Sequence, residues 1–122
     1  ARVGLIGFCM GGMYCFKAAP LFDRVASFYG MIRMPIDWKG PSQAEPLEIL
    51  RDADATGVFA VIGGRDTWTP ETDVAALRAT GATVALYPDA EHGFAHDASR
   101  PSHRKIEAAD AFERARAWLN DD

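Results

Sequence analysis

The sequence has few basic residues, few cysteines and no long apolar segment. Lys and Arg number 13 against 17 Asp and Glu, which gives a net charge of −4. No basic cluster is interleaved with aromatic residues, so a nucleic-acid-binding surface is not expected. No apolar run approaches the roughly 20 residues of a membrane span, and no charged leader precedes such a run. We therefore expect a cytoplasmic protein with no nucleic-acid partner and no membrane partner.

The two cysteines and three histidines offer little for a crosslink or a metal. Cys9 and Cys15 fall on different faces of the helix expected there, so they form a poor disulfide pair, and Cys15 is expected to be buried. The histidines lie far from both cysteines in sequence. Because a glycine between His92 and His96 argues against a helix there, we expect no metal site.

Strand-like and helix-like segments alternate along the chain. Apolar runs predict strands over residues 2–8, 25–29, 58–62 and 83–87. Helices are predicted over residues 10–19, 45–53 and 70–81 and from 102 or 103 to 120, with an irregular connection over 30–43. This alternation is typical of βαβ units. We expect one α/β domain over residues 1–122, with about four mostly parallel strands and flanking helices.

Two of the helices carry more specific expectations. Thr69 followed by Pro70 predicts an N-cap and a first-turn proline. The last helix is expected to bury the apolar residues that recur at helical spacing, namely Ile106, Ala109, Phe112 and Leu119.

Cys9 is the most informative residue. It lies in Gly7-Phe8-Cys9-Met10-Gly11, directly after the first expected strand. The Gly-x-Ser-x-Gly nucleophile elbow of α/β-hydrolases has the same pattern, here with a thiol as the nucleophile. Glycine at positions 7 and 11 is expected to let the backbone form the strained turn. The pattern predicts nucleophilic catalysis.

Two further candidates follow later strands. Asp66 comes after the third expected strand and His92 after the fourth. The order Cys9, Asp66, His92 is the nucleophile, acid, base order of α/β-hydrolases. His92 and the start of the helix at Met10 would give the Cys9 thiol the electropositive setting that it needs to ionise near neutral pH. Taken singly, each residue has an ordinary explanation as a buried thiol, a turn carboxylate or a loop histidine.

These motifs resemble those of a known family. Gly7-Phe8-Cys9-Met10-Gly11-Gly12, Gly63-Gly64-Arg65-Asp66 and His92-Gly93-Phe94 are similar to the signature stretches of the dienelactone hydrolase (carboxymethylenebutenolidase) family, which has an α/β-hydrolase fold. The resemblance covers only the carboxyl-terminal half of that fold.

The resemblance implies a chemistry and a set of site residues. A Cys-Asp-His triad would open small esters, thioesters or lactones through an acyl-thioester, without a cofactor. Cys9 would be the nucleophile, His92 the general base and Asp66 its orienting residue, and the Met10 amide would be one oxyanion donor. The residues expected to contact the substrate are Phe8, Phe94, His96 and Trp68.

The sequence departs from the family pattern in two ways. The elbow arrives within the first ten residues, so the strands that precede it and the second oxyanion donor are missing. His96 stands where dienelactone enzymes have a carboxylate-binding arginine, which makes dienelactone itself a doubtful substrate. We expect a fragment, a processed product or a natural truncation.

The missing half leaves alternatives for function and assembly. The chain is expected to be a hydrolase when that half is supplied, or else an inactive half-hydrolase remnant or interaction module. A redox thiol protein is a weaker alternative because Cys9 lacks a partner at Cys-x-x-Cys spacing. The unpaired first strand, with an apolar patch from Tyr14 and Phe16, predicts a homodimer through that strand or the adjacent face.

Overall fold

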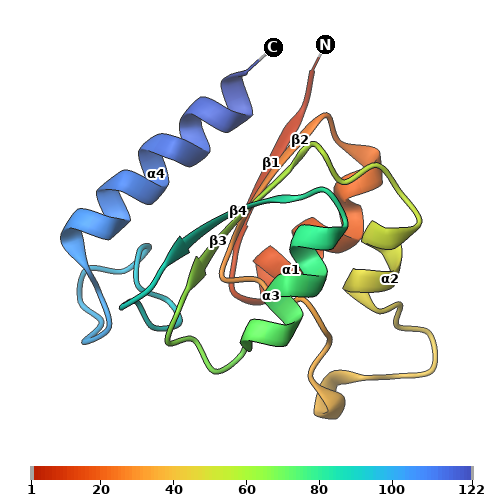
Figure 1. Cartoon of the computed structure of the whole chain (residues 1–122), viewed down its shortest axis with the longest axis horizontal. Coiled ribbons are helices and arrows are strands. Elements are labelled where there is room, and N and C mark those ends of the chain that lie inside the picture. The colour runs from red at the N-terminus through yellow and green to blue at the C-terminus, as the bar shows by residue number, and fades with distance from the viewer. Residues whose placement is uncertain (1, 122) are drawn as a thin grey trace.

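Four short apolar segments form one parallel sheet in the computed structural model, which describes residues 2–121 (Figure 1). The strands are β1 (Gly4–Phe8), β2 (Arg24–Phe28), β3 (Val58–Gly63) and β4 (Thr83–Tyr87), and they lie in the order β1-β2-β3-β4. Every neighbouring pair is parallel. The predicted α/β fold with parallel strands is confirmed.

Helices cover both faces of the sheet (Figure 1). One face carries α1 (Met10–Ala18), α2 (Pro46–Arg51) and α3 (Glu71–Ala79), and the other carries α4 (Lys105–Asn120). Short 3-10 turns, η1 (Ala19–Leu21) and η2 (Ile36–Trp38), lie in the connections. No helix within residues 2–121 is long and apolar enough to cross a bilayer.

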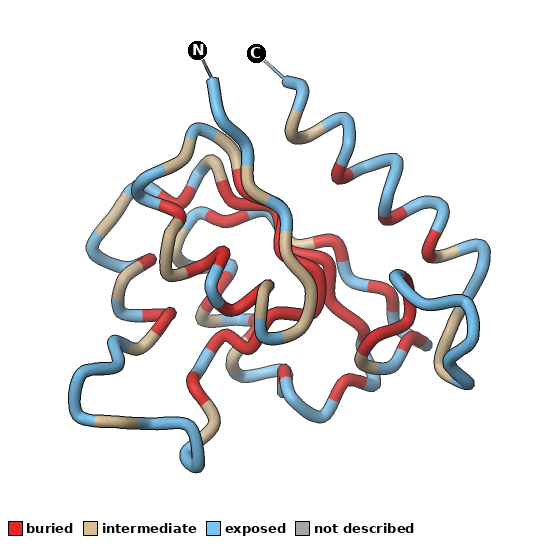
Figure 2. The backbone as a smooth tube through the Cα atoms, turned by 180° about the vertical axis from the view of Figure 1, so that it is seen from behind, coloured by how far each residue is buried: buried red, intermediate tan, exposed pale blue. Residues whose placement is uncertain are grey.

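The central strand β3 contributes to both layers of the core. Val58, Ala60 and Ile62 pack with α1, α2 and α3, whereas Phe59 and Val61 pack with α4. All six residues of β3 are buried, because helices cover both of its faces (Figure 2).

The first strand forms one edge of the sheet. Within residues 2–121, β1 pairs with β2 alone, and each of its residues is exposed or half-buried (Figure 2). Ile6 is 44% exposed and Tyr14 on α1 is 47% exposed, but Phe16 is fully buried. The predicted open edge is therefore confirmed, while the expectation that Phe16 joins an exposed apolar patch is wrong.

The start of α3 differs from the sequence prediction. The N-cap residue is Pro70, and no side chain caps this helix. Thr69 is instead buried in the preceding turn, where its N–H donates to the Asp66 carbonyl oxygen at 3.3 Å. Thr69 thus bonds to the backbone of Asp66 and does not cap the helix, so the Thr69 N-cap prediction is wrong.

The buried face of α4 also differs from the prediction. The residues buried against the sheet are Ala108, Ala111 and Ala115, whereas Ile106 is 82% exposed and Phe112 is 38% exposed. Alanine side chains let the helix approach the sheet closely, and hydrophobic spacing alone did not distinguish them from the larger residues on the adjoining face. Phe112 lies instead near the open edge of β1, beside Phe8.

Candidate active site

The residues predicted to carry the chemistry follow the strands at one edge of the sheet. Cys9 follows β1, Asp66 follows β3 and His92 follows β4. Tyr29, which the sequence analysis did not select, follows β2. Because the strands are parallel, their carboxyl ends meet at the same edge, where α/β proteins place their ligand sites.

Cys9 occupies a strained turn between β1 and α1. Its φ of 57° and ψ of −119° are rare for a residue with a side chain, and such a conformation costs about 1–3 kcal/mol. The Cys9 N–H donates to the Phe28 carbonyl oxygen at 3.0 Å, and the Cys9 carbonyl oxygen accepts from the Met13 N–H at 3.1 Å. These two hydrogen bonds attach the turn to β2 and to α1.

The close approach of Gly7 to α1 shapes the same turn. A Cβ at Gly7 would lie 2.6 Å from the Gly11 carbonyl carbon and 2.8 Å from Cys15 Sγ, closer than real Cβ atoms come. A Cβ at Gly11 would meet no heavy atom within 4 Å. The structure therefore requires glycine at position 7, whereas a Cβ at position 11 would lie in open space.

Asp66 and His92 form a polar pair in which the carboxylate is buried and the imidazole is half-buried. The Asp66 side chain is fully buried, and its Oδ2 lies 2.8 Å from His92 Nδ1. Its Oδ1 accepts a second hydrogen bond from the Trp68 N–H at 2.8 Å. A carboxylate held in this way keeps the proton of a neutral imidazole on Nδ1, which leaves the Nε2 lone pair available as a base.

The Cys9 thiol is half-buried and forms no disulfide. Burial raises the pKa of the Cys9 thiol above its usual value, and the positive charge of Arg100 opposes this rise without reversing it. Within residues 2–121 no hydrogen bond joins His92 to Cys9. Sequence reasoning missed Arg100, which no local motif marks. Burial raises the pKa of Cys15, the other thiol, to about 11.

Tyr29 links the site to His96. The buried Tyr29 hydroxyl accepts from the His96 N–H at 3.2 Å and donates to His96 Nδ1 at 2.5 Å. Burial raises the pKa of Tyr29 to about 12. Burial and the Arg100 charge lower the pKa of His96. Both groups are therefore neutral near pH 7. A polar residue directly after a buried strand was the sequence signal that would have found Tyr29.

Aromatic rings surround these polar groups. Trp68 is 46% exposed, with its ring centroid 6.4 Å from that of His92, and it stacks on Trp38 at 5.9 Å. Phe8 packs against His96 with ring centroids 5.3 Å apart. The structure thus brings Trp68, Phe8 and His96 to the site, together with Trp38, which came from the irregular connection and was not predicted.

The last two predicted site residues differ in exposure. Phe94 is fully buried, with its ring near those of Tyr29 and Tyr87, so it occupies a core position. Met10 is the first residue of α1 and is 51% exposed. As a first-turn residue, Met10 has no acceptor for its N–H within its own helix, which leaves that donor available to a ligand.

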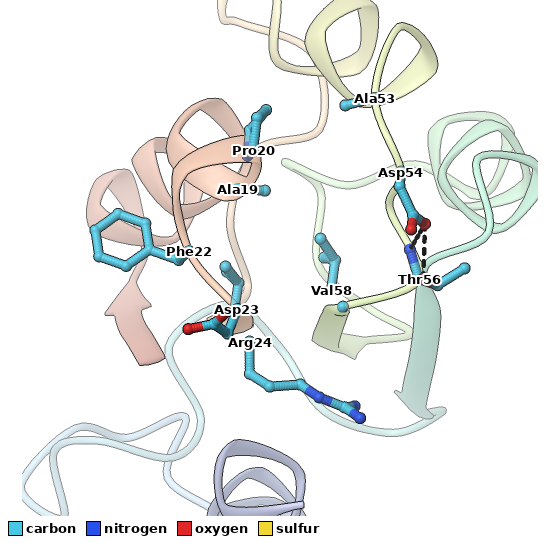
Figure 3. Close-up of a pocket in the computed structure, with 11 residues that line it drawn as sticks. Ala19, Pro20, Phe22, Asp23, Arg24, Ala53, Asp54, Thr56 and Val58 are labelled. Carbon is cyan, nitrogen blue, oxygen red and sulfur yellow. Dashed lines mark hydrogen bonds between the residues drawn. The ribbon is translucent and has the colours of Figure 1, made fainter. Parts of the chain in front are cut away.

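A cavity at the opposite edge of the sheet has no comparable chemistry. It measures about 460 Å³ and lies at the amino ends of β2 and β3, where Figure 3 shows its lining residues. Asp54 already accepts hydrogen bonds from the Thr56 N–H at 3.0 Å and the Thr56 hydroxyl at 2.6 Å. Asp23 accepts from the Val3 N–H at 3.0 Å. We therefore place the candidate site at the Cys9 edge.

This chain is similar to known proteins over nearly its whole length. A family model described as the dienelactone hydrolase family matches residues 1–122. A protein of Synechocystis sp., provisionally named carboxymethylenebutenolidase, is 34% identical over 123 residues, covering 94% of this chain and 48% of that protein. A protein of Methylorubrum extorquens with the same provisional name is 32% identical over 128 residues, covering 98% and 43%.

Solved structures give the same result. The crystal structure of a provisionally assigned dienelactone hydrolase from Klebsiella pneumoniae superposes with a TM-score of 0.82 at 26% identity, covering 98% of this chain and 52% of that one. The chain thus spans about half the length of the curated relatives it matches.

Proposed function

The chain belongs to the dienelactone hydrolase family, and we propose that it hydrolyses small esters, thioesters or lactones with a Cys9-His92-Asp66 triad. The observation that carries this proposal is the 2.8 Å contact between His92 Nδ1 and the buried Asp66 carboxylate, at the sheet edge where Cys9 occupies its strained turn. A buried carboxylate that orients a histidine beside a nucleophile's turn supports acyl transfer.

The proposed reaction has two halves. The Cys9 sulfur attacks the carbonyl carbon while its proton passes to His92 Nε2, and the Met10 N–H donates to the resulting oxyanion. The carbon–oxygen bond to the leaving group then breaks, and His92 returns the proton to the leaving alkoxide. Water attacks the acyl-thioester, His92 takes its proton, and the carboxylic acid and the thiol are released.

The contact between His92 and Cys9 would form during this reaction. Catalytic hydrogen bonds are often long in a resting site and tighten when the substrate is bound. The Asp66 carboxylate stabilises the imidazolium that forms on His92.

Exposed rings suit an unsaturated or aromatic acyl group at this site. Trp68 and Trp38 are 46% and 40% exposed and stack on each other beside His92. We propose that these rings, with Phe8 and His96, contact the substrate. Phe94 is left out because it is fully buried.

The test uses p-nitrophenyl acetate and three variants. We expect the chain to release p-nitrophenol, and Cys9→Ala and His92→Ala to reduce that rate at least about 100-fold, the effect of losing a nucleophile or a general base. Cys15→Ala is the matched control because that thiol is buried, and it should keep the activity. A well-folded chain with no activity would instead favour an inactive half-hydrolase or interaction module.

The open edge of β1 supports a proposal on assembly. Val3 just before β1, Ile6 on β1 and Phe112 on α4 are 54%, 44% and 38% exposed. A cavity of about 510 Å³ lies between these two elements. Unpaired strand edges and exposed apolar faces promote association, so we propose a homodimer through this strand or its neighbouring face.

Light scattering tests the homodimer. Leu5 packs against the core, so Leu5→Lys risks unfolding, and Ile6→Lys is the better variant because Ile6 is exposed. We expect a dimer that dissociates in Ile6→Lys. A monomer at high micromolar concentration, or a dimer that Ile6→Lys leaves intact, would contradict this assembly.

A further inference from the structure

Tyr29 occupies a strained position just after β2. Its φ is +43°, in the left-handed region that a residue with a side chain seldom adopts. Such a conformation is unfavourable and persists only where the surrounding structure fixes it. The Tyr29 N–H donates to the Val61 carbonyl oxygen at 2.7 Å, which attaches this residue to β3. Residues kept in this conformation cluster at functional sites.

The Tyr29 ring packs against three rings of the loop that follows β4. Its centroid lies 5.2 Å from that of His92, 5.7 Å from that of Phe94 and 5.6 Å from that of His96. These separations are typical of aromatic contacts. Tyr29 and Phe94 are both fully buried. One side chain at the end of β2 thus contacts His92 and two of the four residues that follow it.

The Tyr29 hydroxyl anchors the far end of the same loop. It accepts from the His96 N–H at 3.2 Å and donates to His96 Nδ1 at 2.5 Å. A hydroxyl has one proton to donate and lone pairs to accept with, so a single oxygen atom can make both bonds. The backbone and the side chain of His96 are therefore both bound to Tyr29.

The other contacts of His92 leave the face of its imidazole to be supported. Asp66 Oδ2 lies 2.8 Å from Nδ1, which fixes one edge of the ring. The next residue, Gly93, has a φ of +74° and belongs to the residue type with the greatest backbone freedom. Two aromatic rings, those of Tyr29 and Trp68, lie 5.2 Å and 6.4 Å from the imidazole centroid. Of these two, Trp68 is 46% exposed and Tyr29 is buried.

We propose that Tyr29 is a positioning residue, which holds the His92 imidazole on Asp66 by packing against its ring and by anchoring the loop at His96. A catalytic base is effective when packing and hydrogen bonds lock it in its productive orientation. Tyr29 acts through His92 and His96 and not on the substrate. The inference rests on the proposed role of His92 as the general base.

The test follows the proton that His92 Nδ1 shares with Asp66. A proton held on a buried carboxylate gives a downfield signal in the proton NMR spectrum when its exchange with water is slow. The absence of this signal in His92→Ala assigns it. Exchange with water requires local opening of the loop, so the exchange rate, measured by saturation transfer from water at pH 7, reports how firmly His92 is held.

We expect Tyr29→Phe to speed this exchange about 5- to 30-fold, the effect of losing one or two hydrogen bonds while the ring is kept. Tyr29→Leu also removes the ring contact and should exchange faster still. The matched control is Tyr87→Phe, because Tyr87 is buried and its hydroxyl donates to Asp110 Oδ2 at 2.7 Å, outside the His92 loop. This control should leave the exchange rate unchanged.

A double variant tests whether the hydroxyl acts through His96. His96→Leu removes the side-chain acceptor, so adding Tyr29→Phe to it should speed exchange by a smaller factor than Tyr29→Phe does in the wild type. Urea unfolding of each protein separates local opening from a loss of overall stability.

Three results would overturn the proposal. The first is the same exchange rate in Tyr29→Phe and in Tyr87→Phe. The second is an effect of Tyr29→Phe that is as large with His96→Leu as without it. The third is a wild type that lacks the downfield signal, because His92 would then not be held on Asp66. No ester is used, so an inactive chain in which Tyr29→Phe speeds exchange would reject the proposed hydrolase and keep the positioning role.

Discussion

Gly7→Ala should destabilise the chain, whereas Gly11→Ala should not. The added methyl at position 7 would lie 2.6 Å from the Gly11 carbonyl carbon and 2.8 Å from Cys15 Sγ. Backbone lies on one side of it and a buried thiol on the other, so the clash cannot be relieved by rotating an exposed side chain. Overpacking of this kind costs about 1–3 kcal/mol, and moving α1 away from β1 would also disturb the Cys9 turn.

The control variant, Gly11→Ala, should change the free energy of unfolding in the opposite direction. Gly11 lies in α1, and a Cβ there meets no heavy atom within 4 Å. Replacing a helical glycine by alanine reduces the entropy that folding loses and stabilises by up to about 1 kcal/mol. The two variants therefore differ by about 1–4 kcal/mol, although both remove a glycine of the same Gly-x-Cys-x-Gly motif.

Urea unfolding followed by circular dichroism measures this difference. The midpoint for Gly7→Ala should fall and that for Gly11→Ala should stay or rise, with similar slopes for both. Equal destabilisation of the two variants would refute the structural reading and indicate that the motif needs both glycines for another reason.

Further predictions concern the core and alkaline pH. Phe16→Ala should cost about 3–5 kcal/mol in urea unfolding because the ring is fully buried, whereas Tyr14→Ala on the exposed side of α1 should cost much less; equal costs would contradict the burial. The free energy of unfolding should fall as the pH rises from 9.0 toward about 12, because Cys15 and Tyr29 have folded pKa values raised to about 11 and about 12 from 9.0 and 10.0. The two groups contribute fully to the free energy of unfolding below their pKa values in the unfolded chain. This contribution is lost as the pH approaches their pKa values in the folded chain, since the unfolded chain releases these protons first. Cys15→Ala should make the decline between pH 9.0 and about 11 shallower, and an unchanged slope would exclude Cys15 as a source.

Local patterns were sufficient to predict the sheet and three of the site residues. Strands such as Val58–Gly63 are continuous apolar runs that end at glycine, so each strand can be read without knowing its neighbours. Cys9 follows such a run directly, and Asp66 and His92 lie in the loops that follow β3 and β4. Parallel strand order alone then brings them to one edge of the sheet.

The missed features depend on contacts between distant segments. Arg100 lies in a loop without a motif, and only the fold of that loop brings its guanidinium against Gly93, the residue after His92. Trp38 belongs to an irregular connection and joins the site by stacking on Trp68. Likewise, α4 packs on the sheet through the small side chains of Ala108, Ala111 and Ala115, which allow a close approach. Hydrophobic periodicity carries no information on this distance of approach.

The most direct test of the central claim is to trap the acyl-enzyme. The chain is mixed with p-nitrophenyl acetate, quenched in acid within the first turnover, and analysed by intact-mass and peptide mass spectrometry. We expect one acetyl group per chain, located on Cys9 and not on Cys15. The same acetyl group should form much more slowly in His92→Ala and in Asp66→Ala. An acetyl group on another residue, or acylation of Cys9 at the wild-type rate in both variants, would contradict the proposed triad.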